Sequence, residues 1–144
     1  MLGVGALILS GDSILLIERG GEPLRGYWSL PGGAVETGES LKEAIIREMR
    51  EETSLDVEPY AIFEIFERIM RDAEGRAEYH YVLVDFLCRI VGGTMGAGDD
   101  VSRVEWVPRH RLSEFLLTEG TLPVIEKAFS ACATPVQTFS NFPS

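Results

Sequence analysis

Three glutamates in one short segment are the residues of this chain best suited to chemistry. Glu48, Glu51 and Glu52 are spaced so that, at about 100° per residue, they share one side of a helix. Apolar residues such as Ala44 and Met49 share or flank that side. Like charges one turn apart repel, and a carboxylate taken out of water is destabilising unless something compensates it. On an ordinary solvated helix the glutamates would instead lie opposite the apolar stripe.

A hard divalent cation would resolve this conflict. Mg²⁺ takes oxygen ligands and is commonly held by a few carboxylates together with the phosphates of a substrate. Such an ion neutralises charge that develops on phosphate and lowers the pKa of a bound water. The pattern therefore favours metal-assisted chemistry on a phosphate compound over a plain solvated helix.

Local signals place the glutamates on a helix that follows a glycine turn. Ser40 and Glu43 have the spacing of a capping box, in which each side chain accepts a hydrogen bond from a free backbone N–H at a helix start. No Gly or Pro occurs from Leu41 to Thr53, and good helix formers dominate that stretch. The run Pro31-Gly32-Gly33 comes before it, and glycine lets a backbone approach a ligand closely.

The order of residues from Gly33 to Leu55, GAVETGESLKEAIIREMREETSL, resembles the Nudix box, the signature of the Nudix hydrolase family. The charged positions match that pattern at its spacing. The departure is Ser54, where the pattern has the glycine that ends the helix. We expect a negative φ at Ser54, because serine lacks the amide or carboxylate with which Asn and Asp settle in the left-handed conformation.

The resemblance implies an α/β (α+β) fold, an α/β/α sandwich around a mixed sheet, and Mg²⁺- or Mn²⁺-dependent hydrolysis of a nucleoside diphosphate linked to another group. By position in the box, the metal ligands would be Glu48, Glu51, Glu52 and the carbonyl of Gly32. Arg47 would orient the glutamates and act with them in catalysis, and Glu39 would hold Arg47 in place.

The substrate expected from the resemblance is a small nucleotide. The segments PLRGYWSLPGG before the box and YHYVLVDF after it resemble the ADP-ribose pyrophosphatase-like branch of the family. A MutT-like (d)NTP pyrophosphohydrolase is the alternative enzyme. A non-catalytic nucleotide sensor on the same fold is a third reading, which the intact glutamates disfavour.

Four charged residues outside the box are candidates for contact with the substrate. Arg19 ends a strand and Arg25 lies in the loop that follows, where a guanidinium could bind phosphate, although exposed arginines are common at strand ends. Asp99 and Asp100 form an acidic pair in a glycine-rich loop. They are candidates for a general base, against the simpler reading of a solvated turn.

Aromatic and histidine side chains give weaker candidates. His80 alternates with Val82 and Val84, so we expect it to face the sheet interior, as a core residue or as part of the site. Tyr27 and Trp28 could stack on a base, although such residues are more often part of the core.

Periodicity and turn residues predict the remaining elements. Strands are expected at 2–10, 13–18, 27–30, 57–70, 78–90 and 101–107, and helices at 112–117 and 122–131. The pairs 2–10/13–18 and 57–70/78–90 should form hairpins. We assign residues 1–131 to one domain and residues 132–144 to a tail.

Composition limits the classes of partner. The chain has 144 residues, of which 45% are hydrophobic, and a formal net charge of −10, which argues against a nucleic-acid partner. A phosphorylated small molecule stays compatible, because Mg²⁺ supplies positive charge locally. Cys88 and Cys132 form no CxxC pattern and suggest buried thiols in the cytoplasm. The apolar start is too short for a membrane span, so no membrane partner is expected, and a homodimer is left open.

Overall fold

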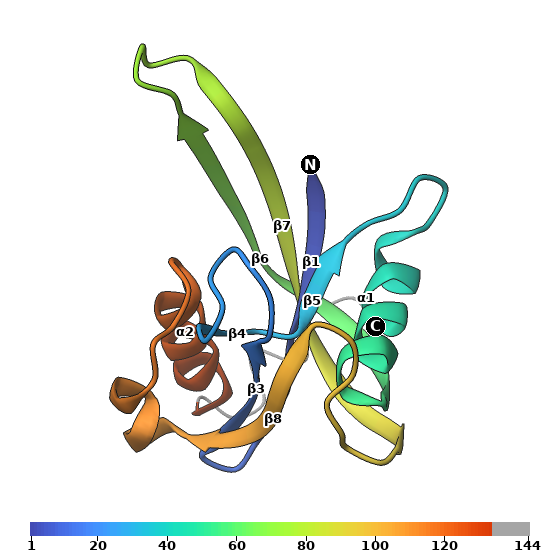
Figure 1. Cartoon of the computed structure of the whole chain (residues 1–144). Coiled ribbons are helices and arrows are strands. Elements are labelled where there is room, and N and C mark those ends of the chain that lie inside the picture. Colours follow the sequence, from blue (N-terminus) through green and yellow to red (C-terminus); the bar gives the residue numbers. More distant parts are fainter. Residues whose placement is uncertain (134–144) are drawn as a thin grey trace.

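The strands of the protein divide into two sheets, with a helix on either side of them (Figure 1). A computed structural model describes residues 1–133, so the predicted tail lies almost wholly outside the described residues. The strands are β1 (Leu2–Leu7), β2 (Leu9–Ser10), β3 (Ser13–Arg19), β4 (Trp28–Ser29), β5 (Gly32–Ala34), β6 (Leu55–Arg71), β7 (Ala77–Gly93) and β8 (Val101–Pro108). The helices are α1 (Leu41–Thr53), the 3₁₀ helix η1 (Arg109–Glu114) and α2 (Thr121–Ala133).

The first sheet is mixed, as the sequence predicted. Its order is β5-β1-β7-β6, in which β1 and β7 run parallel and the other pairs are antiparallel. The second sheet contains β2, β3, β4 and β8, all antiparallel. The predicted strand 2–10 is therefore shared between the two sheets, because the chain passes from one to the other at Ile8. The expected central layer is confirmed in its mixed character and helical cover, but it is built from two sheets.

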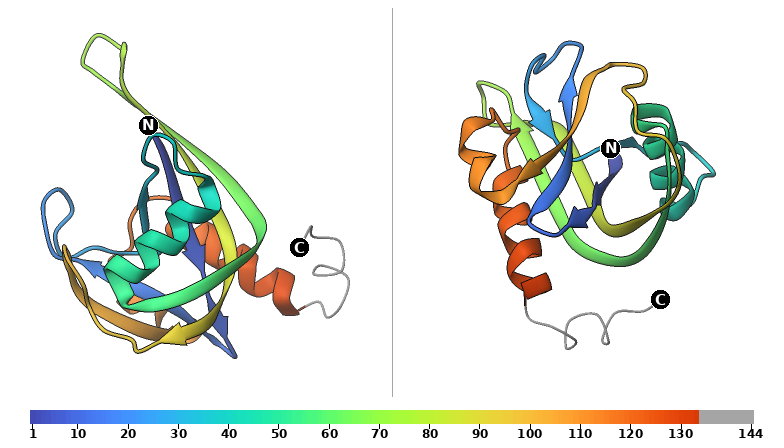
Figure 2. Two further views of the ribbon diagram at one scale, coloured as in Figure 1. Left: turned by 90° about the vertical axis from the view of Figure 1, so that its right-hand side faces the viewer. Right: turned by 90° about the horizontal axis from the view of Figure 1, so that it is seen from below.

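Apolar side chains fill the space between the strands and each helix. On the α1 side, Ile45 and Met49 pack with Val84 and Phe86 of β7. On the α2 side, Ile125 packs in a second cluster with residues of both sheets. Figure 2 shows from below that the two helices lie on opposite sides of the strands. The part of the chain that the structure describes therefore has two hydrophobic clusters, and the first sheet contributes to both.

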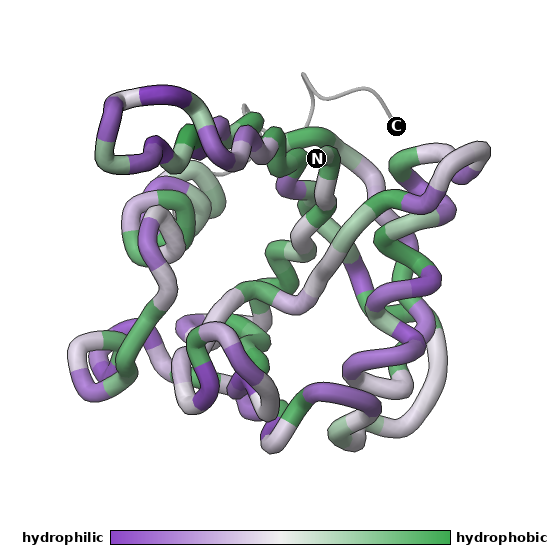
Figure 3. Tube along the Cα trace, turned by 45° about the horizontal axis from the view of Figure 1, so that its top comes forward, coloured by the Kyte–Doolittle hydropathy of each residue, from purple (hydrophilic) through white to green (hydrophobic). Residues whose placement is uncertain are grey.

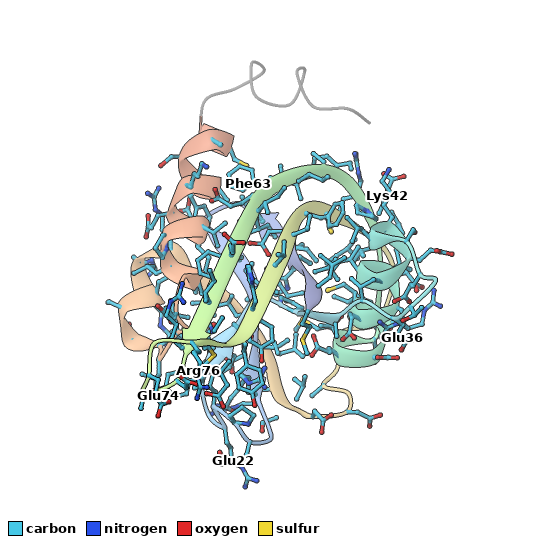
Figure 4. All side chains as sticks on the ribbon, turned by 90° about the horizontal axis from the view of Figure 1, so that it is seen from above. Glu22, Glu36, Lys42, Phe63, Glu74 and Arg76 are labelled. Carbon is cyan, nitrogen blue, oxygen red and sulfur yellow. The ribbon has the colours of Figure 1, made fainter. Side chains whose placement is uncertain are left out.

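The hairpin β6–β7 is much longer than the body of the protein requires. Its outer half projects past the other strands (Figure 1), and the tube is mostly hydrophilic around its turn (Figure 3). Glu74 and Arg76 mark its turn in Figure 4. His80 lies in this outer half, is exposed, and has its Nε2 2.6 Å from a carboxylate oxygen of Glu67. The prediction that His80 faces the sheet interior is therefore wrong, because alternation along a strand implies burial only where another layer covers the sheet.

The acidic helix begins and ends through local hydrogen bonds. Ser40 Oγ accepts from the backbone N–H of Glu43 at 3.1 Å, and Glu43 Oε1 accepts from that of Ser40 at 2.8 Å, so the predicted capping box is present. At the other end, Ser54 is left-handed, with φ of 62°, and donates its N–H to the carbonyl of Arg50. The expected negative φ is wrong. Buried Leu55 starts β6 directly after Ser54, so the chain must reverse within one residue.

Three other predictions differ in detail. The Pro31-Gly32-Gly33 run is not only a turn, because Gly32–Ala34 forms β5 on the edge of β1. The predicted helix 112–117 is the 3₁₀ helix η1, which starts earlier and ends at Glu114. Cys88 is buried as expected, whereas Cys132 is partly exposed. Within residues 1–133, neither α-helix is long and apolar enough to cross a membrane.

Candidate active site

The guanidinium of Arg47 forms the centre of a cluster of carboxylates on α1. It donates two hydrogen bonds to Glu39, at 2.7 and 3.0 Å, and single bonds to Glu48 at 2.9 Å and Glu51 at 3.1 Å. A fifth bond, of 3.0 Å, goes to the carbonyl of Ala34 in β5. These are the contacts that the sequence assigned to Arg47 and Glu39. Because these bonds join α1 to the loop before it and to β5, they fix the position of the helix backbone that carries Glu48, Glu51 and Glu52.

In each of the three glutamates expected to bind metal, one carboxylate oxygen accepts a hydrogen bond and the other accepts none from residues 1–133. Oε1 of Glu48 and Oε2 of Glu51 accept from Arg47, and Oε1 of Glu52 accepts from the backbone N–H of Gly32 at 2.7 Å. Among residues 1–133 no donor binds the second oxygen of any of the three, and no three acidic, His or Cys side chains already form a metal-binding group. Three free carboxylate oxygens match the ligands that a hard divalent cation prefers, so the donor set fits Mg²⁺ or Mn²⁺.

Burial makes the ionised form of Glu48 and Glu52 unfavourable unless positive charge lies nearby. Burial raises the pKa of Glu52 to about 8, against the opposing effects of the Gly32 N–H and of Arg19. It also raises the pKa of Glu48, whose side chain is 14% exposed, although the bond from Arg47 opposes this. Glu39 differs, because its hydrogen bonds from Arg47 lower its pKa. The cluster thus holds more negative charge than one guanidinium balances.

Two glycines of β5 let the strand lie against the glutamates. A Cβ on Gly33 would lie 2.6 Å from the carboxylate carbon of Glu48, which is closer than real Cβ contacts. A Cβ on Gly32 would lie 2.0 Å from the backbone oxygen of Val4 in β1. A side chain is therefore excluded at Gly32 by backbone, whereas one at Gly33 would have to displace the carboxylate of Glu48. The predicted role of the Gly32 carbonyl as a metal ligand stays a prediction, while its N–H already orients Glu52.

A cleft opens on the face of the first sheet that lies away from α1. Its volume is about 230 Å³, and it reaches from the glycines of β5 across β1 and β7 to the start of α2. Its polar lining comes from Arg19, Ser29, Arg68, Asp85, Thr118, Glu119 and Thr121, and its apolar lining from Val4, Leu24, Leu30, Phe66, Leu83 and Val124. Gly32 and Gly33 belong both to this cleft and to the glutamate cluster. The two regions therefore meet at β5.

Of the four charged candidates outside the box, Arg19 lines the cleft. Its Nε donates to the carbonyl of Pro23 at 3.2 Å, and it lies close enough to Glu52 to lower that residue's pKa. Arg25 is not among the lining residues; it is exposed and lies 3.5 Å from Glu22. The structure thus brings Arg19 to the site and leaves Arg25 outside it.

The acidic pair lies near the end of α1 without lining the cleft. Asp99 and Asp100 are both exposed. Their loop is tied to α1, because the N–H groups of Gly96 and Gly98 donate to backbone carbonyls of its last two residues, at 2.9 and 3.0 Å. A side chain on Gly98 would overlap the carbonyl of Glu51. The loop therefore runs alongside the glutamate-bearing end of α1, and the role of the pair as general base stays a prediction.

The aromatic and histidine candidates lie elsewhere. Trp28 is 6% exposed and packs edge-on against Phe115, with ring centroids 5.0 Å apart, so it belongs to the core and is not free to stack on a base. Tyr27 is half-buried beside it and does not line the cleft. His80 lies on the projecting hairpin, outside the cleft. The predicted substrate contacts of Trp28 and His80 therefore find no support in the structure.

Sequence reasoning missed three charged residues of the cleft, which are Arg68, Asp85 and Glu119. Asp85 is 7% exposed although it lies in the middle of β7. Arg68 of β6 has a buried Nε without a hydrogen bond, because the nearest carboxylate oxygen, of Glu119, is 3.6 Å away. The signal for Asp85 was present, since an acid inside the apolar run VLVDFLC is unusual for a buried strand. No comparable signal marks Arg68.

Comparison with known proteins gives one family. The NUDIX domain model matches residues 1–128. An ADP-ribose pyrophosphatase from Methanocaldococcus jannaschii is 34% identical over 111 residues, which cover 77% of this chain and 63% of that protein. The 8-oxo-dGDP phosphatase NUDT18 of Homo sapiens is 32% identical over 121 residues, covering 81% and 35%. The chain thus spans less than two thirds of the length of these relatives.

Solved structures agree on the fold. The NUDIX domain of Shewanella oneidensis NrtR, crystallised with ADP ribose, has a TM-score of 0.72 at 25% identity, covering 92% of this chain and 88% of that one. A MutT NUDIX hydrolase from Burkholderia pseudomallei has a TM-score of 0.70 at 28% identity, covering 87% and 95%. These similarities extend over nearly all of the described residues.

Proposed function

Because the chain belongs to the Nudix family, we propose that it hydrolyses the pyrophosphate bond of a nucleoside diphosphate linked to another group, with Mg²⁺ or Mn²⁺ as cofactor and an ADP-ribose-like molecule as substrate. The observation that carries this proposal is the free oxygen on each of Glu48, Glu51 and Glu52, beside a cleft that Arg19 lines. The archaeal relative that is named an ADP-ribose pyrophosphatase supports the choice of substrate.

One set of residues would orient the glutamates that bind the metal, and another would bind the phosphate of the substrate. Arg47 restrains Glu48 and Glu51 through one oxygen each, so that their other oxygens need little reorganisation to bind a cation. The bond from Gly32 does the same for Glu52. Arg19 can bind a phosphate oxygen at the cleft end nearest the glutamates. When bound, the metal would neutralise phosphate charge and activate a water.

A (d)NTP pyrophosphohydrolase is the second candidate. The human relative named an 8-oxo-dGDP phosphatase favours a nucleotide without a second sugar. A sensor without activity is disfavoured, because all three glutamates are present with their free oxygens. The products separate the two enzymes: ADP-ribose and water give AMP and ribose 5-phosphate, whereas a dNTP and water give dNMP and pyrophosphate.

The test is a hydrolysis screen of ADP-ribose, dinucleoside polyphosphates and (d)NTPs with Mg²⁺, with products separated by ion-exchange chromatography. We expect turnover of ADP-ribose that excess EDTA abolishes. Glu52→Gln should lower kcat by at least about 10²-fold, on the scale of other preorganised electrostatic groups. Lys42→Ala, an exposed change on the same helix, is the matched control (Figure 4). Full activity in EDTA, or equal effects of both substitutions, would refute the metal-centred proposal.

A further inference from the structure

Asp85 is an acid held at the floor of the cleft. Along β7, Val84 and Phe86 face the α1 side and pack in its cluster, whereas Leu83 and Asp85 line the cleft on the other face. Only 7% of Asp85 is exposed. A functional side chain is thus placed by a strand in the middle of the sheet, one of the most rigid positions that the fold offers.

No donor or cation of the described residues compensates this acid. Within residues 1–133 no donor forms a hydrogen bond with the Asp85 carboxylate and no Lys or Arg pairs with it; the charged neighbour that affects it is the carboxylate of Glu64 on β6, which is itself paired with Lys127 at 2.9 Å. Burial raises the pKa of Asp85 to about 6. A largely buried carboxylate without a partner destabilises the fold, and such groups are rare in native proteins. An acid that only filled space would be replaced by an apolar residue at no loss.

The strand register fixes where this acid lies relative to the glutamate cluster. Gly5 of β1 pairs with Gly32 on one side and with Asp85 on the other. Two strand spacings of about 4.8 Å put Asp85 roughly 10 Å from Gly32. A Cβ on Gly5 would lie 2.5 Å from Oδ1 of Asp85, so glycine leaves the space beside the carboxylate open. A nucleotide whose phosphate lies at β5 would place its ribose and base over this distance.

The cleft around Asp85 suits the flat ring of a base better than a sugar. Leu30, Leu83 and Val124 are apolar lining residues, and Phe66, which pairs with Leu83 across β6 and β7, also lines the cleft. Ring faces bury well against such side chains, whereas ribose hydroxyls would lose hydrogen bonds to water there. An ionised carboxylate only accepts hydrogen bonds, so the ring edge that it binds must donate.

We propose that Asp85 is a specificity-determining residue, which accepts a hydrogen bond from the 6-amino group of adenine and so selects adenine over hypoxanthine. This inference rests on the proposed function, since it names the base recognised at the same site. Hypoxanthine carries a carbonyl oxygen where adenine has its 6-amino group, and its nearest donor, N1–H, lies one ring position away, so the carboxylate would face an acceptor. A site built to bind a polar group rejects an analogue without it strongly, because the site's own buried group is left unpaired.

The experiment compares ADP-ribose with IDP-ribose, which have the same ribose and pyrophosphate. We expect the wild-type protein to favour ADP-ribose in kcat/KM by at least about 10-fold, in line with one base-edge contact. Asp85→Asn should reduce that ratio by about 10-fold or more, because an amide can turn its NH₂ toward the carbonyl. Glu78→Gln, an exposed change on the same strand, should leave the ratio unaltered. The melting temperature of each variant shows that it is folded.

The same ratio measured by equilibrium binding separates this inference from the proposed function. Absence of turnover for every nucleotide would refute the hydrolase proposal, while a binding preference for ADP-ribose that Asp85→Asn removes would still support the role of Asp85. Turnover with an unchanged ratio in Asp85→Asn would overturn the inference and leave the hydrolase proposal intact. An equal loss for both nucleotides would also overturn it, because it would assign Asp85 to a shared part of the substrate or to the fold.

Discussion

Arg47→Lys keeps the positive charge on α1 but removes the planar fork that holds the glutamates. The guanidinium makes five hydrogen bonds, of which four go to carboxylates. A single ammonium has three donors on one atom, so at least two of the five bonds are lost. Bonds to charged groups contribute about 1.5–3 kcal/mol each when buried, and much less at the surface. Since Arg47 is 24% exposed and Glu51 is 53% exposed, we expect a loss of about 1–3 kcal/mol in unfolding free energy.

The assay measures stability and metal affinity in the same variants. Urea unfolding followed by circular dichroism gives the free energy, and calorimetric titration with Mg²⁺ gives the dissociation constant. Loss of a residue that orients ligands typically weakens metal binding by about 10- to 100-fold, and we expect that range for Arg47→Lys. Arg50→Lys is the matched control: Arg50 is 66% exposed and bonds to one oxygen of Asp56, so its change should stay below about 0.5 kcal/mol.

Two results would refute this reasoning. Equal stability and equal Mg²⁺ affinity in the two variants would show that the bonds of Arg47 are exchangeable with those of any surface arginine. A loss of stability in Arg47→Lys with unchanged Mg²⁺ affinity would show that Arg47 supports the helix and does not position Glu48 and Glu51.

Three further changes test other parts of the structure. Ser54→Gly should raise the unfolding free energy by up to about 1 kcal/mol, because relief of left-handed strain (about 1 kcal/mol or more) exceeds the extra entropy of an unfolded glycine, and a lower urea midpoint would contradict this. Gly33→Ala should weaken Mg²⁺ binding with little change in melting temperature, since its Cβ displaces the flexible end of Glu48; unaltered Mg²⁺ affinity would show that Glu48 tolerates the shift. Burial raises the pKa of Asp85 from 3.8 to about 6, so the folded protein binds this proton more tightly than the unfolded chain and loses stability as pH rises from about 4 through 6. Asp85→Asn removes that loss, while the charged neighbours Glu64, Lys127 and Arg68 stay unchanged. Relative to the wild type, the unfolding free energy of this variant should be higher by up to about 3 kcal/mol at pH 7.5 and by little at pH 4. An equal difference at both pH values would contradict the raised pKa of Asp85.

Local signals in the sequence predicted the acidic helix with its bounds. Ser40 and Glu43 specify its start through bonds within four residues, and no tertiary contact is needed to recognise them. The same local view failed at Ser54. Serine has no preference for positive φ, but the next residue begins a buried strand in the opposite direction, and that tertiary demand determines the backbone conformation.

Alternation along strands predicted the long hairpin but not its surroundings. His80 and Asp85 lie on the same strand in runs of apolar neighbours, and the sequence suggested burial for His80 and gave Asp85 no role. The structure reverses this: His80 is exposed on the projecting half, and Asp85 is buried where β1 pairs with its strand and the start of α2 lies over the sheet. How far a hairpin extends past its neighbours depends on strand pairing across the whole fold, which period-2 patterns do not encode.

The arrangement of the site also explains why the glutamate cluster could be predicted from the sequence and the cleft could not. The ligand set lies on one helix, so the identity and spacing of its residues appear as a continuous motif. The cleft lies on the opposite face of the first sheet and takes its lining from β1, β4, β6, β7 and the start of α2, so its residues are scattered over more than a hundred positions. Gly32 and Gly33 join the two, because they line the cleft and contact Glu52 and Glu48. A change of base preference can therefore arise on β7 or at the start of α2 without disturbing a bond within the glutamate cluster, so Asp85→Asn tests base preference while the ligand set stays intact.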